Sequence, residues 1–591
     1  MRAGRSSPGS GSGWVGRGQN PIVCIRGGSS ALRGADDPPT PGTATARVGL
    51  DLVRCPDQPV RRLRCRDRSP SGRPAHGLRH PGTASHWTVW FDRRHGWIRS
   101  AAPPDRNDRC DDGGVDENDQ IPVGTESCPK KVVVFYGVVL HFLEDPWIDV
   151  EGEDNPDSYQ LYRPGALVVA DGRVEWVGPR RELPARYASA DRVDHGDSLI
   201  TPGFVDTHIH LAQVDAIASP GHQLLPWLKH SMYPAEMKFA DLDYARRACW
   251  FFCDTLLSAG TTTASVYTAT YKHSTDALFA EAARRGMRLV TGKLLMDDNF
   301  QASVPPGYLD KCPEKAIEES RELIERWHGH DRLRFSVSPR FALTSTAKAL
   351  GLAGDLYREH ADSEHPLWVQ SHIAESRDEV DAALRKFKDL GPRSYLDIYD
   401  RFRLVGPRSV WGHAVWLDGA DHDLLATTGA AAAFCPTSNL FLGSGLFPLS
   451  PCSRAGVRIG LGTDVGGGTS YSLLATLNEA YKVVALSNAY PDRIPDERRM
   501  TLTALRSFYL ATLGGARALH LDRDIGSFAR GREADFVVLD WAATPVLARR
   551  TQVADSFEER LFALATLGDD RAVSHTYLLG ALAHERDRES R

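Results

Sequence analysis

Two histidines at alternate positions end an apolar run in the stretch TPGFVDTHIH, residues 201–210. If this run is a strand, His208 and His210 point to the same side, because side chains two residues apart share a face. Two neighbouring imidazoles are ligands that a divalent transition metal prefers. Taken alone, the pair is equally compatible with a strand that carries one hydrogen-bonded and one exposed histidine. Polar residues elsewhere in the chain have to decide between the two interpretations.

Chemically capable side chains also end four other apolar runs. Each has a structural alternative when taken singly: a core histidine bonded to a carbonyl, a turn aspartate, a solvated arginine or a neighbour of a helix N-cap. Their shared position at the ends of predicted strands favours a common site. The residues are Arg340 and Phe341 in FSVSPRF, His372 and Glu375 in LWVQSHIAE, His413 in SVWGH, and Asp464 in IGLGTD.

Three histidines and one aspartate from this set form a plausible zinc site, with water in the remaining position. Zinc lowers the pKa of bound water to about 7, which provides hydroxide at neutral pH. The predicted ligands are His208, His210, His372 and Asp464.

A proton acceptor must lie close to such a water, and Glu375, three residues past His372, can take the proton and pass it to a leaving nitrogen. Asp464 would also orient the water. His413 is either a further ligand or a donor to that water, and its spacing does not separate the two roles. A two-metal site of this kind commonly uses a carboxylated lysine where this chain has Arg340, so we expect one metal.

Strand-like and helix-like runs alternate through the middle of the chain. Eight strands in this alternation predict a closed (β/α)8 TIM-like barrel, whose chemistry lies at the C-terminal ends of its strands. Alternation alone would also permit an open doubly wound sheet. The predicted strands lie in LITPGFVDTHIH, TTTASVYTA, RLVTGKLLM, RLRFSVSPRF, PLWVQSHIAE, SVWGHAVWL, AAAFCPTSN and RIGLGTDVG.

Short strand-like runs flank this region on both sides. They include GALVVADGRVEWVG, with a hairpin turn at Asp171 and Gly172, and EADFVVLDW and SHTYLLGALAHE near the other end. We therefore predict a small composite β-sandwich domain built from both ends of the folded region. The expected division is residues 131–200 for its first part, 201–515 for the barrel, and 516–591 for its second part and the C-terminal segment.

The first 130 residues differ in composition from the rest. They are rich in Arg, Gly, Pro and Ser, contain no lysine before Lys130, and show no apolar periodicity. Such a segment cannot bury enough apolar surface to fold, so residues 1–130 are predicted to be a disordered extension. A transit peptide, a start placed too far upstream, and an arginine arm for nucleic acid are the alternatives.

The totals of the 591-residue chain argue against several other classes of protein. The net charge is −5, which indicates no affinity for nucleic acid or for a membrane surface, and no apolar run reaches the roughly 18 residues of a spanning helix. Five of the ten cysteines lie in the first 130 residues, and no CxxC pair is present. This pattern is typical of a reducing cytoplasm rather than of a disulfide framework.

Several motifs carry a family resemblance that extends from about Lys131 to near the C-terminus. PGFVDTHIH, SHIAE, WGHAV and GTDVGGG, in this order, resemble the amidohydrolase superfamily and its single-metal deaminase branch. THIHLAQ, LLPWLKHSMYPAE, SPRFALTST, FCPTSNLFLGSGLF and GTDVGGGTSYSLLATLNEAYKV are similar to the bacterial guanine deaminase family. The short HxH and GTD motifs are shared widely, and the longer stretches are more specific.

The resemblance implies hydrolytic deamination of guanine to xanthine and ammonia. It places the metal ligands on His208, His210, His372 and Asp464, the proton shuttle on Glu375, and the catalytic histidine of the sixth strand on His413. It also places guanine recognition on Gln213, Arg340 and Phe341, with His210, His372 and Glu375 close to the substrate. One Zn²⁺ per subunit is expected, although the same ligands accept Fe²⁺.

The resemblance further implies a homodimer in the cytoplasm. A related deaminase of another purine, a pterin or a triazine is the nearest alternative, and a catalytically inactive barrel that serves as a scaffold is another. Two departures from the family bear on substrate preference. Pro226 stands where the family usually has an acidic residue, and the segment DDNFQASVPPGYLDKCPEKA is longer than the family's usual form.

Overall fold

The computed structural model describes residues 131–149, 152–221, 223–490 and 498–586. The predictions for residues 1–130, including their five cysteines, lie outside the described residues.

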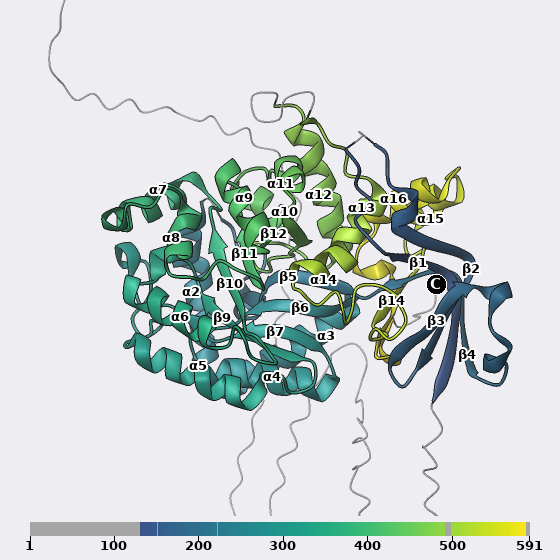
Figure 1. Ribbon diagram of the computed structural model, residues 1–591, viewed down its shortest axis with the longest axis horizontal. Coiled ribbons are helices and arrows are strands. Elements are labelled where there is room, and N and C mark those ends of the chain that lie inside the picture. The colour runs from purple at the N-terminus through teal and green to yellow at the C-terminus, as the bar shows by residue number, and fades with distance from the viewer. Residues whose placement is uncertain (1–130, 150–151, 222, 491–497, 587–591) are drawn as a thin grey trace, which may run out of the picture. The chain divides into compact units, whose positions relative to one another are not determined.

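Eight parallel strands of one sheet form a nearly closed barrel, which confirms the predicted fold class (Figure 1). Every pair of neighbouring strands is parallel, in the chain order β5-β6-β7-β9-β10-β11-β12-β13, and the short β8 pairs with β9. The strands are β5 (Phe204–His210), β6 (Thr261–Tyr267), β7 (Arg288–Gly292), β8 (Leu294–Leu295), β9 (Leu333–Pro339), β10 (Trp368–Ile373), β11 (Ser409–His413), β12 (Ala431–Phe434) and β13 (Arg458–Leu461).

Backbone hydrogen bonds close the barrel between its first and last strands. The amide of Asp464 donates to the carbonyl of His208 at 2.8 Å, and the amide of His210 donates to the carbonyl of Val465 at 2.9 Å. These bonds lie just beyond β13. The closure is therefore made by the same residues that were predicted to bind metal.

Helices cover the outside of the barrel, and their sequences explain where they begin and what they bury. Asp241 caps α3, which turns Cys249, Phe252 and Cys253 into the core, as the spacing of its apolar residues predicts. The helices within the barrel region are α1 (Leu224–Trp227), α2 (Tyr233–Glu236), α3 (Leu242–Ser258), α4 (Lys272–Arg285), α5 (Pro313–Trp327), α6 (Ala347–Glu359), α7 (Arg377–Lys386), α8 (Tyr395–Arg401), α9 (Gly419–Thr428), α10 (Pro436–Phe441), α11 (Leu449–Ala455) and α12 (Leu473–Ser487).

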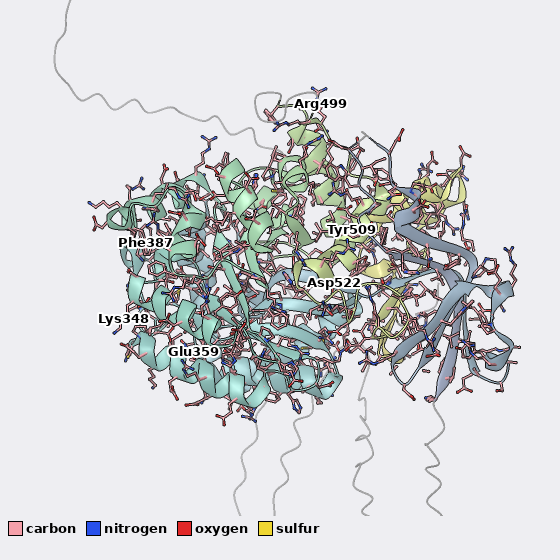
Figure 2. All side chains as sticks on the ribbon, viewed as in Figure 1. Lys348, Glu359, Phe387, Arg499, Tyr509 and Asp522 are labelled. Atoms are coloured by element: carbon pink, nitrogen blue, oxygen red, sulfur yellow. The ribbon has the colours of Figure 1, made fainter. Side chains whose placement is uncertain are left out.

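Ion pairs on the outer surface join neighbouring helices. Lys348 and Glu359, at the two ends of α6, pair with Glu314 and Arg321 of α5 (Figure 2). Such exposed pairs contribute little to stability, so the attachment of these helices depends mainly on their buried apolar faces.

A second sheet is assembled from both ends of the described chain. Its strand order is β16-β15-β14-β4-β1-β2-β3, so the parallel pair β4 and β1 is flanked by antiparallel strands from either end. The predicted hairpin turn at Asp171 and Gly172 has both residues at positive φ. The strands are β1 (Val132–Phe142), β2 (Tyr159–Ala170), β3 (Arg173–Pro179), β4 (Asp191–Pro202), β14 (Phe536–Leu539), β15 (Val573–Leu578) and β16 (Ala581–Glu585).

The last helices connect the barrel to the returning strands of the second sheet. They are α13 (Ala504–Tyr509), α14 (Gly515–Ala518), α15 (Pro545–Gln552) and α16 (Phe557–Leu567).

The segment LITPGFVDTHIH, which was predicted as one strand, is two strands in two different sheets. β4 ends at Pro202 and β5 begins at Phe204. The amide of Gly203 donates to the carbonyl of Asp535, whereas the amide of Phe204 donates to the carbonyl of Gly260 at the start of the barrel. The Pro202-Gly203 dipeptide at this junction is a turn signal, and the apolar residues on both sides of it explain why the segment was nevertheless predicted as one strand.

Buried ion pairs join the second sheet to the N-terminal ends of the barrel strands. Arg288, the first residue of β7, pairs with Glu533 at 2.5 Å, and Arg332, just before β9, pairs with Glu533 at 3.1 Å and also with Asp535. All four side chains are buried. This network lies at the opposite end of the strands from the predicted site. Within the described ranges, no helix combines the length and the apolar character of a membrane span.

Candidate active site

The four predicted metal ligands converge at the C-terminal end of the barrel. One donor atom from each of His208, His210, His372 and Asp464 lies within 4.8 Å of every other. Oδ1 of Asp464 lies 3.3 Å from Nε2 of His208 and 3.3 Å from Nε2 of His210. The structure thus brings together residues that are up to 256 positions apart, counted from His208 to Asp464.

The hydrogen bonds around these histidines suit a bound cation. Nδ1 of His372 donates to the backbone carbonyl of Arg340 at 2.7 Å, which leaves Nε2 of His372 without a proton and free to act as a ligand. That atom faces Nε2 of His210 at 3.0 Å. Nε2 of His208 is buried and forms no hydrogen bond. Nitrogen atoms that converge in this way on one carboxylate fit a metal such as zinc.

Burial and neighbouring charges shift the pKa values of this group in the direction that metal binding requires. Burial lowers the pKa of His210, and burial together with the nearby imidazoles holds the pKa of His372 well below its usual range. Burial alone would raise the pKa of Asp464, but the adjacent imidazoles of His208 and His210 outweigh it and hold that pKa well below normal. At neutral pH the site therefore offers an ionised carboxylate and neutral His210 and His372 imidazoles.

Glu375 and His413 lie beside the four predicted ligands. Oε2 of Glu375 is 3.4 Å from Nε2 of His413, and Oε1 accepts a hydrogen bond from Oγ of Ser444 at 2.9 Å. Burial, with the charges of Asp464 and Glu379, raises the pKa of Glu375 well above its ordinary value. A carboxyl group in this environment can hold a proton near neutral pH and release it again.

Asn439 sets the orientation of His413. Its Nδ2 donates to Nδ1 of His413 at 3.0 Å, so the neutral imidazole carries its proton on Nε2, toward Glu375 and Asp464. Of the two roles that the sequence left open for His413, this arrangement favours the donor over the ligand. Burial lowers the pKa of His413 to about 3, which keeps the ring neutral.

The backbone turns sharply where strands deliver their side chains to the site. Ala374, His413 and Asp464 have φ values of 49°, 71° and 49°, in the left-handed region that residues other than glycine rarely adopt. These turns lie directly after β10, at the end of β11 and shortly after β13. Each places a functional side chain at the barrel mouth instead of continuing the strand.

Gly412 leaves space for one of the predicted ligands. A Cβ atom at this position would lie 2.4 Å from Cε1 of His208 and 2.6 Å from its Nδ1. The glycine in the WGH stretch is therefore needed because the imidazole of His208 packs directly against the backbone of β11.

Asp206 binds the backbone next to two of the predicted ligands, and the sequence analysis assigned it no role. It is fully buried, and its Oδ1 accepts hydrogen bonds from the amides of His208 and Thr463, each at 3.1 Å. Its Oδ2 accepts from the hydroxyl of Thr463 at 2.5 Å. Asp206 thus ties the end of β5 to the segment after β13. Burial raises its pKa to about 7.

The predicted substrate-reading residues open onto the same pocket as the metal group. Gln213, Arg340 and Phe341 line it, as do the predicted catalytic groups and, of the four ligand candidates, all but His208. An apolar wall completes the pocket, formed by Leu224, Trp227, Leu228 and Leu442.

A buried carboxylate behind this pocket escaped the sequence analysis. Glu236, at the end of α2, accepts hydrogen bonds from Gln213 at 2.8 Å, from Arg340 at 2.6 Å and from Tyr308 at 2.6 Å. Burial would raise its pKa, but Arg340 outweighs this effect and lowers it. The segment after β8, which the resemblance predicted to be longer than usual, supplies Tyr308 and so contacts the carboxylate that binds Gln213 and Arg340. The only sign of Glu236 in the sequence was its place in the LLPWLKHSMYPAE motif.

Comparisons with known proteins agree with this geometry. The amidohydrolase family matches residues 199–583, and a bacterial imidazolonepropionase-like composite domain matches residues 165–190. A guanine deaminase of Escherichia coli (strain K12) is 41% identical over 439 residues, which are 73% of this chain and 95% of that protein.

Two solved structures extend the likeness to three dimensions. A guanine deaminase from Bradyrhizobium japonicum is similar with a TM-score of 0.72 and 35% identity, over 77% of this chain and 100% of that one. A guanine deaminase from C. acetobutylicum with bound guanine in the active site has a TM-score of 0.67 and 25% identity, over 76% and 99% of the two chains.

Proposed function

The chain belongs to the guanine deaminase family of the amidohydrolases, and on that basis we propose that it hydrolyses guanine to xanthine and ammonia. The observation that carries the proposal is the convergence of three histidines and an aspartate at the end of a pocket that also contains a buried glutamate and the three predicted substrate-binding side chains. Family membership identifies the reaction, and the pocket contains the groups that the reaction needs.

One divalent metal, zinc or iron(II), would be held by His208, His210, His372 and Asp464. When bound, the metal supplies water of lowered pKa, so that hydroxide is available near neutral pH. The neutral Nε2 of His372 and the ionised Asp464 are suited to hold it without prior loss of a proton.

Glu375 moves the proton during the reaction. Its carboxylate takes one proton from the water that attacks C2 of guanine and gives it to N3. It then takes the remaining proton from the new C2 hydroxyl and gives it to the amine, which leaves as ammonia while the C2 carbonyl of xanthine forms. Ser444 holds one oxygen of this carboxylate, which leaves the other to face the reacting atoms. His413 directs its Nε2 proton to the same place and stabilises the negative charge that develops there.

Three side chains orient the purine. Arg340 and Gln213 donate hydrogen bonds to the carbonyl and ring nitrogens of guanine, and the ring of Phe341 covers one face of the purine. His210, His372 and Glu375 line the part of the pocket where the C2 amino group would lie. The apolar wall excludes bulk water from the reacting centre.

The decisive experiment is to incubate zinc-loaded protein with guanine and to follow loss of guanine with formation of xanthine and ammonia. Rapid conversion that is abolished by a chelator and restored by added zinc or iron is the expected result. Metal-bound, folded protein that leaves guanine unchanged would contradict the proposal.

We further propose that the protein is a cytoplasmic homodimer. The proposed domain boundaries are those predicted from the sequence, after residues 200 and 515. Free cysteines are consistent with a reducing compartment, since Cys249, Cys253, Cys435 and Cys452 are buried and unpaired. Light scattering of the purified protein would measure the oligomeric state directly.

A further inference from the structure

We infer that Glu236 is a positioning residue that fixes the hydrogen-bonding polarity of the pocket, so that Gln213 and Arg340 present only N–H donors to the substrate. The inference deepens the proposed function, on which it rests for the identity of the ligand as a purine. A pocket of this polarity selects ligands by the hydrogen-bond acceptors that they carry, here a carbonyl oxygen and unprotonated ring nitrogens.

Glu236 acts through other residues rather than on the ligand. Its side chain is 1% exposed, and it does not line the pocket. Both carboxylate oxygens are engaged, Oε1 by Gln213 and Oε2 by Arg340 and Tyr308. Hydrogen bonds to a buried ionised acceptor are stronger than those between neutral groups, so this carboxylate holds its partners firmly.

The amide of Gln213 is held in one orientation by partners of opposite kind. Its Nε2 donates to Glu236 at 2.8 Å, and its Oε1 accepts from the amide of Gly466 at 3.1 Å. A flipped amide would place donor against donor on one side and acceptor against acceptor on the other. One N–H of Gln213 remains, and it is the polar group that this side chain can offer to the pocket.

The guanidinium of Arg340 is held in the same way. Nη1 donates to Glu236 at 2.6 Å, and the ring of Tyr233 lies 5.0 Å from the guanidinium carbon. A guanidinium has no acceptor, so its remaining N–H groups are donors as well. The negative charge of Glu236 allows this cation to stay buried at the pocket wall without a counter-ion from the ligand.

The test replaces Glu236 by glutamine. In Glu236→Gln the new NH₂ group opposes either Gln213 or Arg340, so at least one of these side chains loses its fixed position. We expect KM for guanine to rise about tenfold or more, while kcat changes by less than about threefold and metal content is unchanged. Equilibrium binding of hypoxanthine, which keeps the carbonyl but has no amino group to lose, should weaken in parallel. 2-Aminopurine, which lacks the carbonyl, should be affected less than guanine.

Glu533→Gln is the matched control, because Glu533 is also buried and paired with arginine but lies at the opposite end of the barrel. It should lower thermal stability and leave KM and hypoxanthine binding at wild-type values.

If Glu236→Gln does not fold, Glu236→Asp keeps the charge but withdraws the carboxylate by one methylene, and it should show the same rise in KM. Wild-type KM and hypoxanthine affinity in the folded variant would overturn the inference.

The binding measurement separates the inference from the proposed reaction. A wild-type protein that binds hypoxanthine but does not convert guanine would contradict the reaction, and the Glu236 variants would still report on donor positioning. A double substitution with Gln213→Ala adds a second check. If Glu236 acts through Gln213, the double substitution should weaken hypoxanthine binding by less than the sum of the two single effects.

Discussion

In the proposed reaction Glu375 takes up and releases a proton twice in each turnover, and its environment supports both protonation states. Ser444 favours the charged form, whereas burial favours the neutral form. We expect Glu375→Gln to lower kcat by about 10²- to 10⁴-fold, because the amide keeps the shape but cannot carry the proton. Stopped assays with guanine would measure this loss.

The control for this prediction is Glu359→Gln on the outer face of α6, which should leave kcat unchanged. Metal content and hypoxanthine binding of Glu375→Gln should equal those of the wild type. Near-normal turnover by that variant would remove Glu375 from the mechanism.

Gly412 makes a second prediction at the scale of single residues. A Cβ atom 2.4 Å from the ring of His208 forces that imidazole to move. Gly412→Ala should therefore weaken metal affinity by about 10- to 100-fold, as other changes behind metal ligands do. Titration with a competing chelator measures the effect. Gly419→Ala, where a Cβ meets nothing within 4 Å, is the control. Unchanged affinity in Gly412→Ala would mean that His208 is not a ligand.

The sequence predicted those site residues that follow apolar runs and missed those that act through a partner. His208, His372 and Asp464 stand out because a titratable group at a strand end is unusual. Glu236, Asn439 and Ser444 do not, because their importance lies in contacts with residues 23 to 104 positions away. No local pattern contains that information.

Among the elements, the connection between the first and last barrel strands depends on one buried side chain. Asp206 of β5 accepts three hydrogen bonds, of which the two from Thr463 hold the segment after β13. Asp206→Ala should lower the free energy of unfolding by about 3 kcal/mol, because it leaves buried donors unpaired. Asp206→Asn should cost only about 1 kcal/mol, since an amide oxygen still accepts from the two backbone donors.

Urea denaturation of the metal-free proteins would measure both values without interference from metal binding. An alanine variant no less stable than the asparagine variant would mean that these bonds do not hold the barrel closed.

At this scale the sequence predicted the number and order of the barrel strands correctly but misjudged a junction. Eight apolar runs separated by helices suffice to define the barrel, because each run is long enough to be recognised alone. The change of sheet at Gly203 depends on which carbonyl accepts the amides of Gly203 and Phe204. The first carbonyl belongs to Asp535, near the opposite end of the chain, and the second to Gly260, between α3 and β6. The residues around Gly203 do not reveal these partners.

For the molecule as a whole, one buried and one half-buried histidine outside the site predict sensitivity to acid. Burial lowers the pKa of His141 in β1, and that of His195 in β4, to about 4. Such groups are neutral in the folded protein but take up protons below about pH 6.5 when unfolded. The unfolded state therefore binds more protons between about pH 4 and 6.5, and stability falls as the pH decreases through this range.

A single substitution isolates one part of this effect. His141→Asn keeps an acceptor for the amide of Phe528 but cannot titrate. It should remove a contribution on the order of 2 kcal/mol to the pH dependence of stability, measured by urea denaturation at pH 7 and pH 4.5. The exposed His330→Asn is the control. An unchanged pH dependence in His141→Asn would show that this histidine is already charged in the folded protein or is accessible to solvent.

The pairing order of the second sheet has a consequence for how the protein is made. β4 is synthesised early, but its partner β14 begins only at Phe536, after the whole barrel has been translated. Until then one edge of β4 is unpaired, and an unpaired edge can join the strands of other chains. The metal group is likewise incomplete until Asp464 has emerged. Ribosomes that stall within the barrel would therefore hold nascent chains that are both inactive and prone to aggregation, and molecular chaperones would be needed most during this interval.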